Sequence, residues 1–231
     1  SSGMICDEWA KKDVRVMTYH IDNSGLSSAR NYAIERSHGK YILCLDSDDY
    51  IDKEYVEKAV YILNRNPNVG IVYCRAELFG DEKGEWILPE YSITEMLIRN
   101  CIFVTSMFRR DDWETVGGFF DEIKYGCEDH DFWLSIIELG REVYKIPEIL
   151  FYYRKRIDSI TQVFHANPQK VKEHDLKMKL VDVEFKFTYV DAVEVCLKVG
   201  KDKKYVMELK ANNGLPLWFT SILSELKIYP T

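Results

Sequence analysis

The stretch from Tyr41 to Tyr50 constrains the fold more than any other part of the sequence. It reads Tyr-Ile-Leu-Cys-Leu-Asp-Ser-Asp-Asp-Tyr, an apolar run that ends in three carboxylates within four residues. An apolar run without polar alternation is typical of an interior strand of a parallel sheet that is covered on both faces. Ligands of open α/β sheets bind beyond the carboxyl ends of such strands. We therefore expect Asp46, Asp48 and Asp49 to stand together at a site, with a cation or cationic partner that offsets their charge.

The composition narrows the class of protein. The 231 residues are enough for one sizeable core with a smaller appendage, and the net charge of -7 argues against a general nucleic-acid binder, which needs clustered Lys and Arg. No run of eighteen apolar residues and no signal peptide is visible, so we expect no transmembrane segment. The six cysteines are widely spaced without a Cys-x-x-Cys pair. We predict a cytoplasmic protein whose cysteines are reduced core residues.

Strand-like and helix-like patterns alternate along the first two thirds of the chain, which is the signature of an α/β fold with a mostly parallel sheet flanked by helices. From residue 165 the composition becomes rich in Lys, Glu and Val with helical patterning. The pattern predicts a domain at 1–164 and a mainly helical C-terminal region at 165–231. We expect helices at 5–11, 25–38, 52–66, 93–99 and 128–139, strands at 14–19, 41–46, 69–74, 102–108, 143–146 and 149–153, and a loop or hairpin at 79–90.

The acidic strand end suits a hard divalent cation. Mg²⁺ is usually held by one or two carboxylates together with substrate phosphates, and Asp46 and Asp48 offer such a pair. The alternative interpretation is a turn shaped by Asp48 and Asp49, followed by a helix that Asp52 caps. One turn needs one Asp, whereas this strand end brings three, so we favour the site.

A second acidic cluster, Glu128-Asp-His-Asp131, opens a predicted helix. The helix dipole favours acids in a first turn, but a carboxylate held in a pocket can also serve as a general base. Further along, Arg154-Lys-Arg156 is either a solvated strand end or, beside an acidic metal site, a clamp for a diphosphate.

Taken together, these residues resemble the family 2 glycosyltransferases with the GT-A fold, a Rossmann-like fold. The resemblance covers roughly the first two thirds of the chain and consists of motifs in a fixed order. They are Asn23-Ser-Gly-Leu-Ser-Ser-Ala-Arg-Asn31, Gly39-Lys-Tyr-Ile-Leu-Cys-Leu-Asp-Ser-Asp-Asp49, Val116-Gly-Gly-Phe119, Glu128-Asp-His-Asp131 and the segment from Tyr153 to Thr161.

The resemblance implies roles for single residues. Asp46 and Asp48 would be the Asp-x-Asp (DXD) motif that contacts the donor's ribose and the metal on its diphosphate, with Asp49 in support. Asp129 would be the catalytic base, with Glu128 as the alternative. The residues that would bind the nucleotide and diphosphate are Asn23, Arg30, Asn31, Arg154 and Arg156, and His165 is a candidate for a later metal ligand.

The resemblance also implies a function. It is the inverting, metal-dependent transfer of a sugar from a nucleoside diphosphate donor, most often a UDP-sugar, with Mn²⁺ or Mg²⁺, to a hydroxyl of a glycan or lipid-linked acceptor in bacterial surface polysaccharide synthesis. We expect a location in the cytoplasm at the inner face of the membrane, with peripheral membrane contact, and a homo-oligomer.

Family members begin with a strand, a helix and a second strand ending in Asp-Asp-Gly-Ser, and we expect this chain to lack that part, which would leave sheet edges exposed. The alternative function is therefore an inactive fragment, or a binding or assembly subunit with the same fold. A sugar nucleotidylyltransferase is a third hypothesis, but its Gly-rich phosphate loop is not visible.

Overall fold

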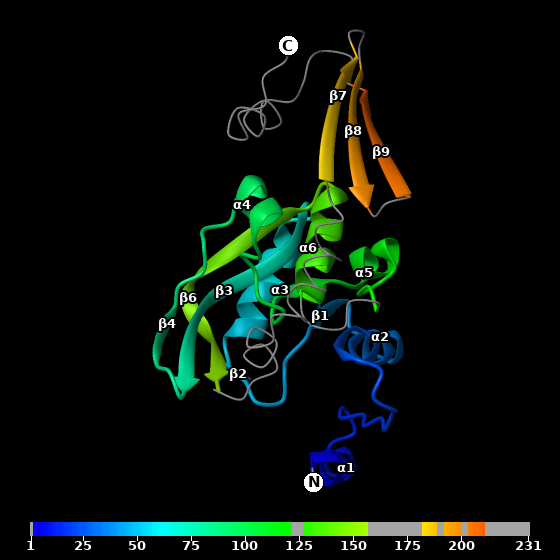
Figure 1. Cartoon of the computed structure of the whole chain (residues 1–231). Helices are drawn as coiled ribbons and strands as arrows, with labels where there is room; N and C mark the ends of the chain where they lie inside the picture. Colours follow the sequence, from blue (N-terminus) through cyan, green and yellow to red (C-terminus); the bar gives the residue numbers. More distant parts are fainter. Residues whose placement is uncertain (1, 122–126, 157–181, 189–191, 200–202, 211–231) are drawn as a thin grey trace. The chain divides into compact units, whose positions relative to one another are not determined.

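The computed structural model describes residues 2–121, 127–156, 182–188, 192–199 and 203–210, and the chain divides into two units, Ser1–Ser159 and Ile160–Thr231 (Figure 1). The helices of the first unit are α1 (Ser2–Lys12), α2 (Leu26–Arg36), α3 (Tyr55–Arg65), α4 (Ile93–Ile98), α5 (Arg110–Val116) and α6 (Glu128–Glu138). Its strands are β1 (Tyr41–Leu43), β2 (Tyr50–Ile51), β3 (Val69–Gly80), β4 (Gly84–Trp86), β5 (Met107–Arg109) and β6 (Glu142–Lys155). The second unit contains β7 (Asp182–Thr188), β8 (Ala192–Val199) and β9 (Lys203–Lys210).

The sheet of the first unit has the order β1-β5-β3-β6-β2, and β4 pairs with β3. Only β3 and β6 pair in parallel, whereas β5 lies antiparallel between β1 and β3, and β2 lies antiparallel to β6. As a result β1, β3 and β6 run in the same direction. The α/β class is confirmed, but the sheet is mixed rather than mostly parallel because β5 enters between two strands of the same direction.

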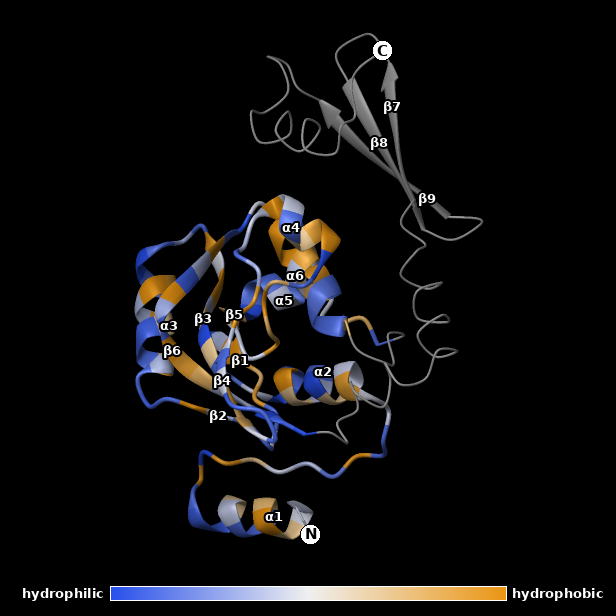
Figure 2. Ribbon diagram, turned by 60° about the vertical axis from the view of Figure 1, so that its left-hand side comes forward, coloured by the Kyte–Doolittle hydropathy of each residue, from blue (hydrophilic) through white to orange (hydrophobic). Residues whose placement is uncertain are grey.

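Helices cover both faces of this sheet. In Figure 2 α3 lies on one side of the sheet and α6 on the other. The hydroxyl of Tyr55, at the start of α3, donates to Thr105 O at 2.9 Å. On the other side a Cβ at Gly70 would lie 3.0 Å from Ile136 of α6, so strand and helix are in close contact. The two helices therefore enclose the first half of β3, whose residues 69–74 are all buried.

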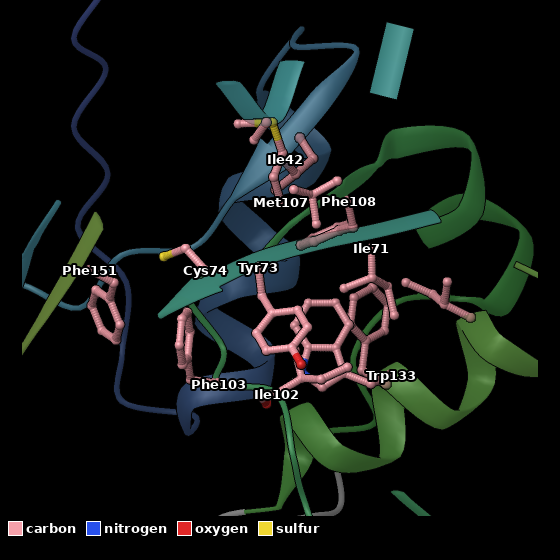
Figure 3. Close-up of a cluster of buried hydrophobic side chains, with 14 of the residues drawn as sticks. Ile42, Ile71, Tyr73, Cys74, Ile102, Phe103, Met107, Phe108, Trp133 and Phe151 are labelled. Carbon is pink, nitrogen blue, oxygen red and sulfur yellow. Dashed lines mark hydrogen bonds between the residues drawn. The ribbon is translucent and has the colours of Figure 1, made fainter. Parts of the chain in front are cut away.

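The core is largely aromatic. Figure 3 shows Tyr73, Ile102 and Trp133 gathered beside β3. The ring of Phe108 meets those of Phe132 and Trp133 edge-on at centroid distances of 4.9 and 5.7 Å. Edge-to-face pairs of this kind stabilise a core beyond the area they bury. This packing fixes the start of α6, on which acidic residues of the candidate site lie.

The acidic stretch after β1 forms a tight turn. The Asp49 N–H donates to Asp46 O at 3.1 Å, which closes a four-residue turn. The chain then enters β2, which pairs Tyr50 with Tyr152 near the carboxyl end of β6. Asp52 follows, and its carboxylate accepts from the Glu54 N–H at 2.8 Å ahead of α3. The turn of the alternative interpretation is thus present, but Asp52 does not cap α3: the N-cap residue is Glu54, and its side chain forms no capping hydrogen bond. The turn and the pairing of β2 hold the three aspartates between β1 and β6.

Several parts differ from the sequence predictions. The strand expected at 102–108 is confined to β5, and those expected at 143–146 and 149–153 form the single strand β6. Residues 14–19 form no strand, because no strand in the described part of the chain pairs with them, and Val14 is 97% exposed. The described residues after 165 lie in the antiparallel sheet β7-β8-β9 and not in the expected helices; apolar and polar residues alternate along β7 with a period of two. Cys6 is exposed on α1 and is not a core residue, whereas Cys74 and Cys101 are buried.

Within the described ranges, no helix combines the length and the apolar character that crossing a bilayer requires.

We predict that Phe108→Ala lowers the free energy of unfolding by about 3–5 kcal/mol, because it removes a fully buried ring that three other rings contact. Denaturant unfolding followed by far-UV circular dichroism measures the loss. Phe120→Ala is the matched control, because this ring is 50% exposed and its removal should cost much less. Equal losses for both variants would contradict the central role of the Phe108 cluster.

Candidate active site

Helix α2 brings a cation to the acidic strand end. Nη2 of Arg30 donates to Oδ1 of Asp46 at 3.1 Å, and its Nη1 donates to Oε1 of Glu128 at 2.5 Å. The side chain of Arg30 is only 10% exposed and that of Glu128 is 8% exposed, whereas Asp46 is 43% exposed. A guanidinium presents several fixed donors and so joins the two acidic clusters in one site. This is the cationic partner that the three aspartates were expected to need.

The second cluster begins α6. Cys127, just before the helix, has a left-handed backbone (φ 66°), and within the described residues it is the only non-glycine residue with a positive φ. Such strain costs on the order of 1–3 kcal/mol and often occurs at functional sites. The turn at Cys127 leads directly into Glu128 and Asp129. The strained residue therefore sets the direction in which the helix that carries both carboxylates begins.

Asp129 has an unusual environment for a carboxylate. Burial raises its pKa to about 6, and the charge of Glu128 contributes to the rise. Hydrogen bonds from the His130 N–H, at 2.8 Å, and from the Asn100 side chain, together with the charge of Arg30, oppose the rise. A carboxylate whose pKa lies near neutrality can accept a proton and release it again at physiological pH.

The remaining aspartates lie beside the end of β6. The Arg154 N–H donates to Oδ1 of Asp49 at 2.7 Å, and Nε of Arg154 donates to Asp48 O at 3.0 Å. Nη2 of Arg156 lies 3.9 Å from Oδ2 of Asp48. Burial raises the pKa of Asp49 to about 6, against the hydrogen bond from Arg154, and the charges of Asp48 and Asp46 add to the rise. The predicted basic segment therefore does adjoin the predicted acidic one.

The donor set fits a divalent cation only in part. The described residues contain no group of three or more His, Cys, Asp or Glu side chains arranged around a common point. The side chains of Asp46 and Asp48 are 43% and 40% exposed, so their oxygens face solvent. Two accessible carboxylates match the usual mode of Mg²⁺, which takes its remaining ligands from water and substrate phosphates. A metal at this place would thus depend on a phosphate ligand.

Asn31 and Asn23 were also predicted to line the nucleotide side of the site. Asn31 bonds the segment that contains Gly118 and Phe119, with its Oδ1 accepting from the Phe119 N–H at 2.9 Å and its Nδ2 donating to Phe119 O at 2.7 Å. Asn23 is exposed before α2 and accepts from the Gly25 N–H at 3.2 Å. The structure brings neither into contact with the aspartates. His165, the candidate metal ligand, lies outside the described residues.

His130 is a buried structural residue, since its Nε2 lies 2.5 Å from Met96 O of α4. This contact ties the start of α6 to α4.

Sequence reasoning missed two contributors to the site. Asn100 hydrogen-bonds the carboxylate of Asp129, while its Oδ1 accepts from the Ile102 N–H at 3.1 Å. The ring of Phe119 lies 5.8 Å from the guanidinium carbon of Arg30. Asn100 carries no sequence signal beyond its place after a short helix. Phe119 did belong to the Val-Gly-Gly-Phe motif, which could have pointed to it.

The fold defines the class of protein. A solved structure of Staphylococcus aureus TarS (1–349) in complex with UDP-GlcNAc aligns with a TM-score of 0.57 at 15% identity and covers 79% of this chain and 55% of the TarS chain. A mannosyltransferase from Pyrobaculum calidifontis, PcManGT, solved with GDP-Man and Mn²⁺, aligns with a TM-score of 0.51 at 18% identity over 74% of this chain and 48% of its own. The first unit therefore has the GT-A type fold of glycosyltransferases.

The sequence identifies the family. The family model described as "Glycosyl transferase family 2" matches residues 1–130, and the chain belongs to this family. The protein named "Uncharacterized glycosyltransferase EpsJ" of Bacillus subtilis (strain 168) is 28% identical over 177 residues, which are 70% of this chain and 51% of EpsJ. The chain thus spans about half the length of this relative.

We predict strong energetic coupling between Arg30 and Glu128. Arg30→Ala should lower the free energy of unfolding by about 3–5 kcal/mol, because it leaves the buried Glu128 carboxylate unpaired. The double variant Arg30→Ala/Glu128→Ala should lose much less than the sum of the two single losses, and a double-mutant cycle by denaturant unfolding measures the difference. Arg36→Ala controls for loss of an exposed pair, with Glu35, and should cost below about 1 kcal/mol. Additive losses for Arg30 and Glu128 would contradict the coupling.

We predict that Asp129→Asn changes how stability depends on pH. The pKa of Asp129 is about 6 in the folded protein and about 4 in the unfolded chain. The folded state therefore holds this proton more tightly, and the stability it contributes is complete below about pH 4 and lost as the pH rises to about 6. Asn does not titrate, so the free energy of unfolding of the variant should rise relative to that of the wild type between pH 4 and pH 7, by up to about 3 kcal/mol.

Denaturant unfolding of both proteins at pH 4, 5, 6 and 7 measures this gain. Asp111→Asn, at an exposed position of α5, controls for the loss of one negative charge. A stability difference between Asp129→Asn and the wild type that stays constant over this range would show that the carboxylate is not held in the environment described.

Proposed function

We propose that this protein transfers a sugar, with inversion, from a nucleoside diphosphate donor to a hydroxyl acceptor in a metal-dependent reaction. The observation that carries the proposal is the double ion pair of Arg30, which joins the Asp-x-Asp motif to the acidic start of α6. One site therefore contains oxygen ligands for a metal-bound diphosphate and a carboxylate whose pKa suits proton transfer. Membership of glycosyl transferase family 2 supports the same reaction class.

Asp129 is a better general base than Glu128. The Glu128 carboxylate is buried and forms a short hydrogen bond with Arg30, so its charge is paired and Oε1 is occupied. Asp129 accepts hydrogen bonds from two neutral donors, the His130 N–H and the Asn100 side chain, and burial raises its pKa to about 6. A base of this pKa removes the proton from an attacking hydroxyl while the sugar is being transferred. Glu128 instead orients Arg30.

The opposite side of the site would hold the leaving diphosphate. Asp46 and Asp48 would bind the divalent cation, Mn²⁺ or Mg²⁺, which supplies positive charge to the departing phosphate oxygens when it is bound. Arg154 and Arg156, at the end of β6, would add guanidinium donors that match phosphate geometry. Asp49 fixes the main chain of Arg154 and thereby keeps this basic segment at the site.

The donor and acceptor follow by analogy. TarS was solved with UDP-GlcNAc, and PcManGT with GDP-Man and Mn²⁺. We propose a UDP-sugar donor and a glycan or lipid-linked acceptor in bacterial surface polysaccharide synthesis. The location in the cytoplasm at the inner face of the membrane stays a prediction, as does the oligomeric state.

We predict that Asp129→Asn lowers kcat for sugar transfer by about 10²–10⁴-fold, because the variant cannot accept the acceptor's proton. The Kd for UDP in the presence of Mn²⁺ should change by less than about threefold, because Asp129 is not among the residues proposed to bind the metal or the diphosphate. Asp48→Asn should have the reverse signature and weaken the Mn²⁺-dependent binding of UDP. Product formation from a panel of nucleotide sugars and isothermal titration calorimetry with UDP, with and without Mn²⁺, provide the measurements.

Asp111→Asn on α5 is the control and should leave both quantities unchanged. Turnover that survives Asp129→Asn would exclude this base, and UDP binding that is independent of metal would exclude the role of Asp48. If the chain bound no nucleotide even with Mn²⁺, the alternative of a binding or assembly subunit would be favoured.

A further inference from the structure

The side chain of Asn31 is committed to one segment of the chain. Its Oδ1 accepts from the Phe119 N–H at 2.9 Å and from Nε1 of Trp113 at 3.1 Å, and its Nδ2 donates to Phe119 O at 2.7 Å. Both polar groups of the amide are therefore used within the protein. An amide so engaged is poorly placed to bind a nucleotide, which was the role first expected for it.

The turn that Asn31 holds is built to receive this amide. Gly117 and Gly118 follow α5, and both have a φ of 83°, a conformation that L side chains rarely adopt. A Cβ at Gly118 would lie 2.7 Å from Oδ1 of Asn31 and 3.1 Å from Nε1 of Trp113. A Cβ at Gly117 would meet nothing within 4 Å. Gly118 thus makes room for Asn31, whereas Gly117 only permits the backbone turn.

The turn from Gly117 to Phe119, held in this way, positions the ring of Phe119. This ring lies 4.1 Å from the ring of Phe132, between centroids, and the Arg30 guanidinium carbon lies 5.8 Å from it. Phe132 is one helical turn after Glu128 on α6, so its ring and the Glu128 carboxylate belong to the same end of that helix. Phe119 therefore packs against α6, the helix that carries the carboxylates, and lies within cation–π distance of Arg30, the cation that pairs with them.

We propose that Asn31 is a positioning residue for the transfer reaction: it clamps the Gly117–Phe119 turn so that the Phe119 ring fixes Arg30 against Asp46 and Glu128. The proposal rests on the function proposed above. Asn31 touches neither substrate nor reacting atoms and acts through Phe119 and Arg30. Loss of the clamp would displace the base relative to the donor side, and a displacement of about 1 Å can lower a rate by about 10²-fold.

Two substitutions disturb the clamp from opposite sides. Asn31→Ala removes the three hydrogen bonds. Gly118→Ala keeps every hydrogen-bonding group but drives a methyl group against Oδ1 of Asn31. Gly117→Ala is the matched control, because it places Ala at the same φ in open space and so reports the backbone strain alone.

Steady-state kinetics and amide hydrogen exchange on the chain give independent readouts. Asn31→Ala and Gly118→Ala should lower kcat by about 10–100-fold with the donor KM changed less than threefold. Exchange of the Phe119 amide should become at least about tenfold faster in Asn31→Ala, because its acceptor is lost. Gly117→Ala should retain most of the wild-type kcat. If Gly118→Ala acted only by destabilising the backbone, the two variants would lose the same amount of kcat.

Unchanged protection of the Phe119 amide in Asn31→Ala, or equal kcat losses in Gly117→Ala and Gly118→Ala, would overturn the positioning role. A rise of the donor KM without a fall of kcat would also overturn it and return Asn31 to a donor-binding role. A wild-type chain that binds UDP but transfers no sugar would instead defeat the proposed function, while the exchange data would still decide whether Asn31 holds the turn.

Discussion

The guanidinium of Arg30 is the contact on which the candidate site depends. Carboxylates from two separate parts of the chain, the turn after β1 and the start of α6, approach each other and would repel without it. Burying a single charge costs several kcal/mol, so neither Arg30 nor Glu128 could be buried alone. Each offsets the cost of burying the other, and their ion pair joins α2 to α6, while the contact of Arg30 with Asp46 joins α2 to the turn after β1.

The acids that are not paired in this way carry a cost in stability. Burial holds the pKa of both Asp49 and Asp129 at about 6, which means that each is less stable as a carboxylate in the folded protein than in the unfolded chain. The left-handed backbone at Cys127 adds strain at the same place. The aromatic core around Phe108 and Trp133 offsets such costs, and it lies directly beneath α6. The core thus stabilises the folded protein, whereas the buried acids and the strained backbone of the site destabilise it.

The sequence could predict what local patterns determine. The helices around 26–36, 55–65 and 128–138 followed from apolar spacing, and the acids at 46–49 followed from the end of an apolar run. It could not show that β5 runs antiparallel between β1 and β3, because register across a sheet depends on distant pairing. The strand β7 was predictable, since its apolar and polar residues alternate, but a composition rich in Lys and Glu suggested helix instead.

The roles of Arg30 and Asn31 show the same limit at the level of single residues. Their place in a motif indicated importance, but the partners of Arg30 lie 16 and 98 positions away and those of Asn31 lie 82 and 88 positions away. Neighbours on a helix point about 100° apart. Arg30 can therefore face the carboxylates while Asn31 faces the turn, and a single placement of α2 satisfies both. A shift of α2 along its axis would break both sets of contacts together, so the two residues act as one unit although only Arg30 touches the site.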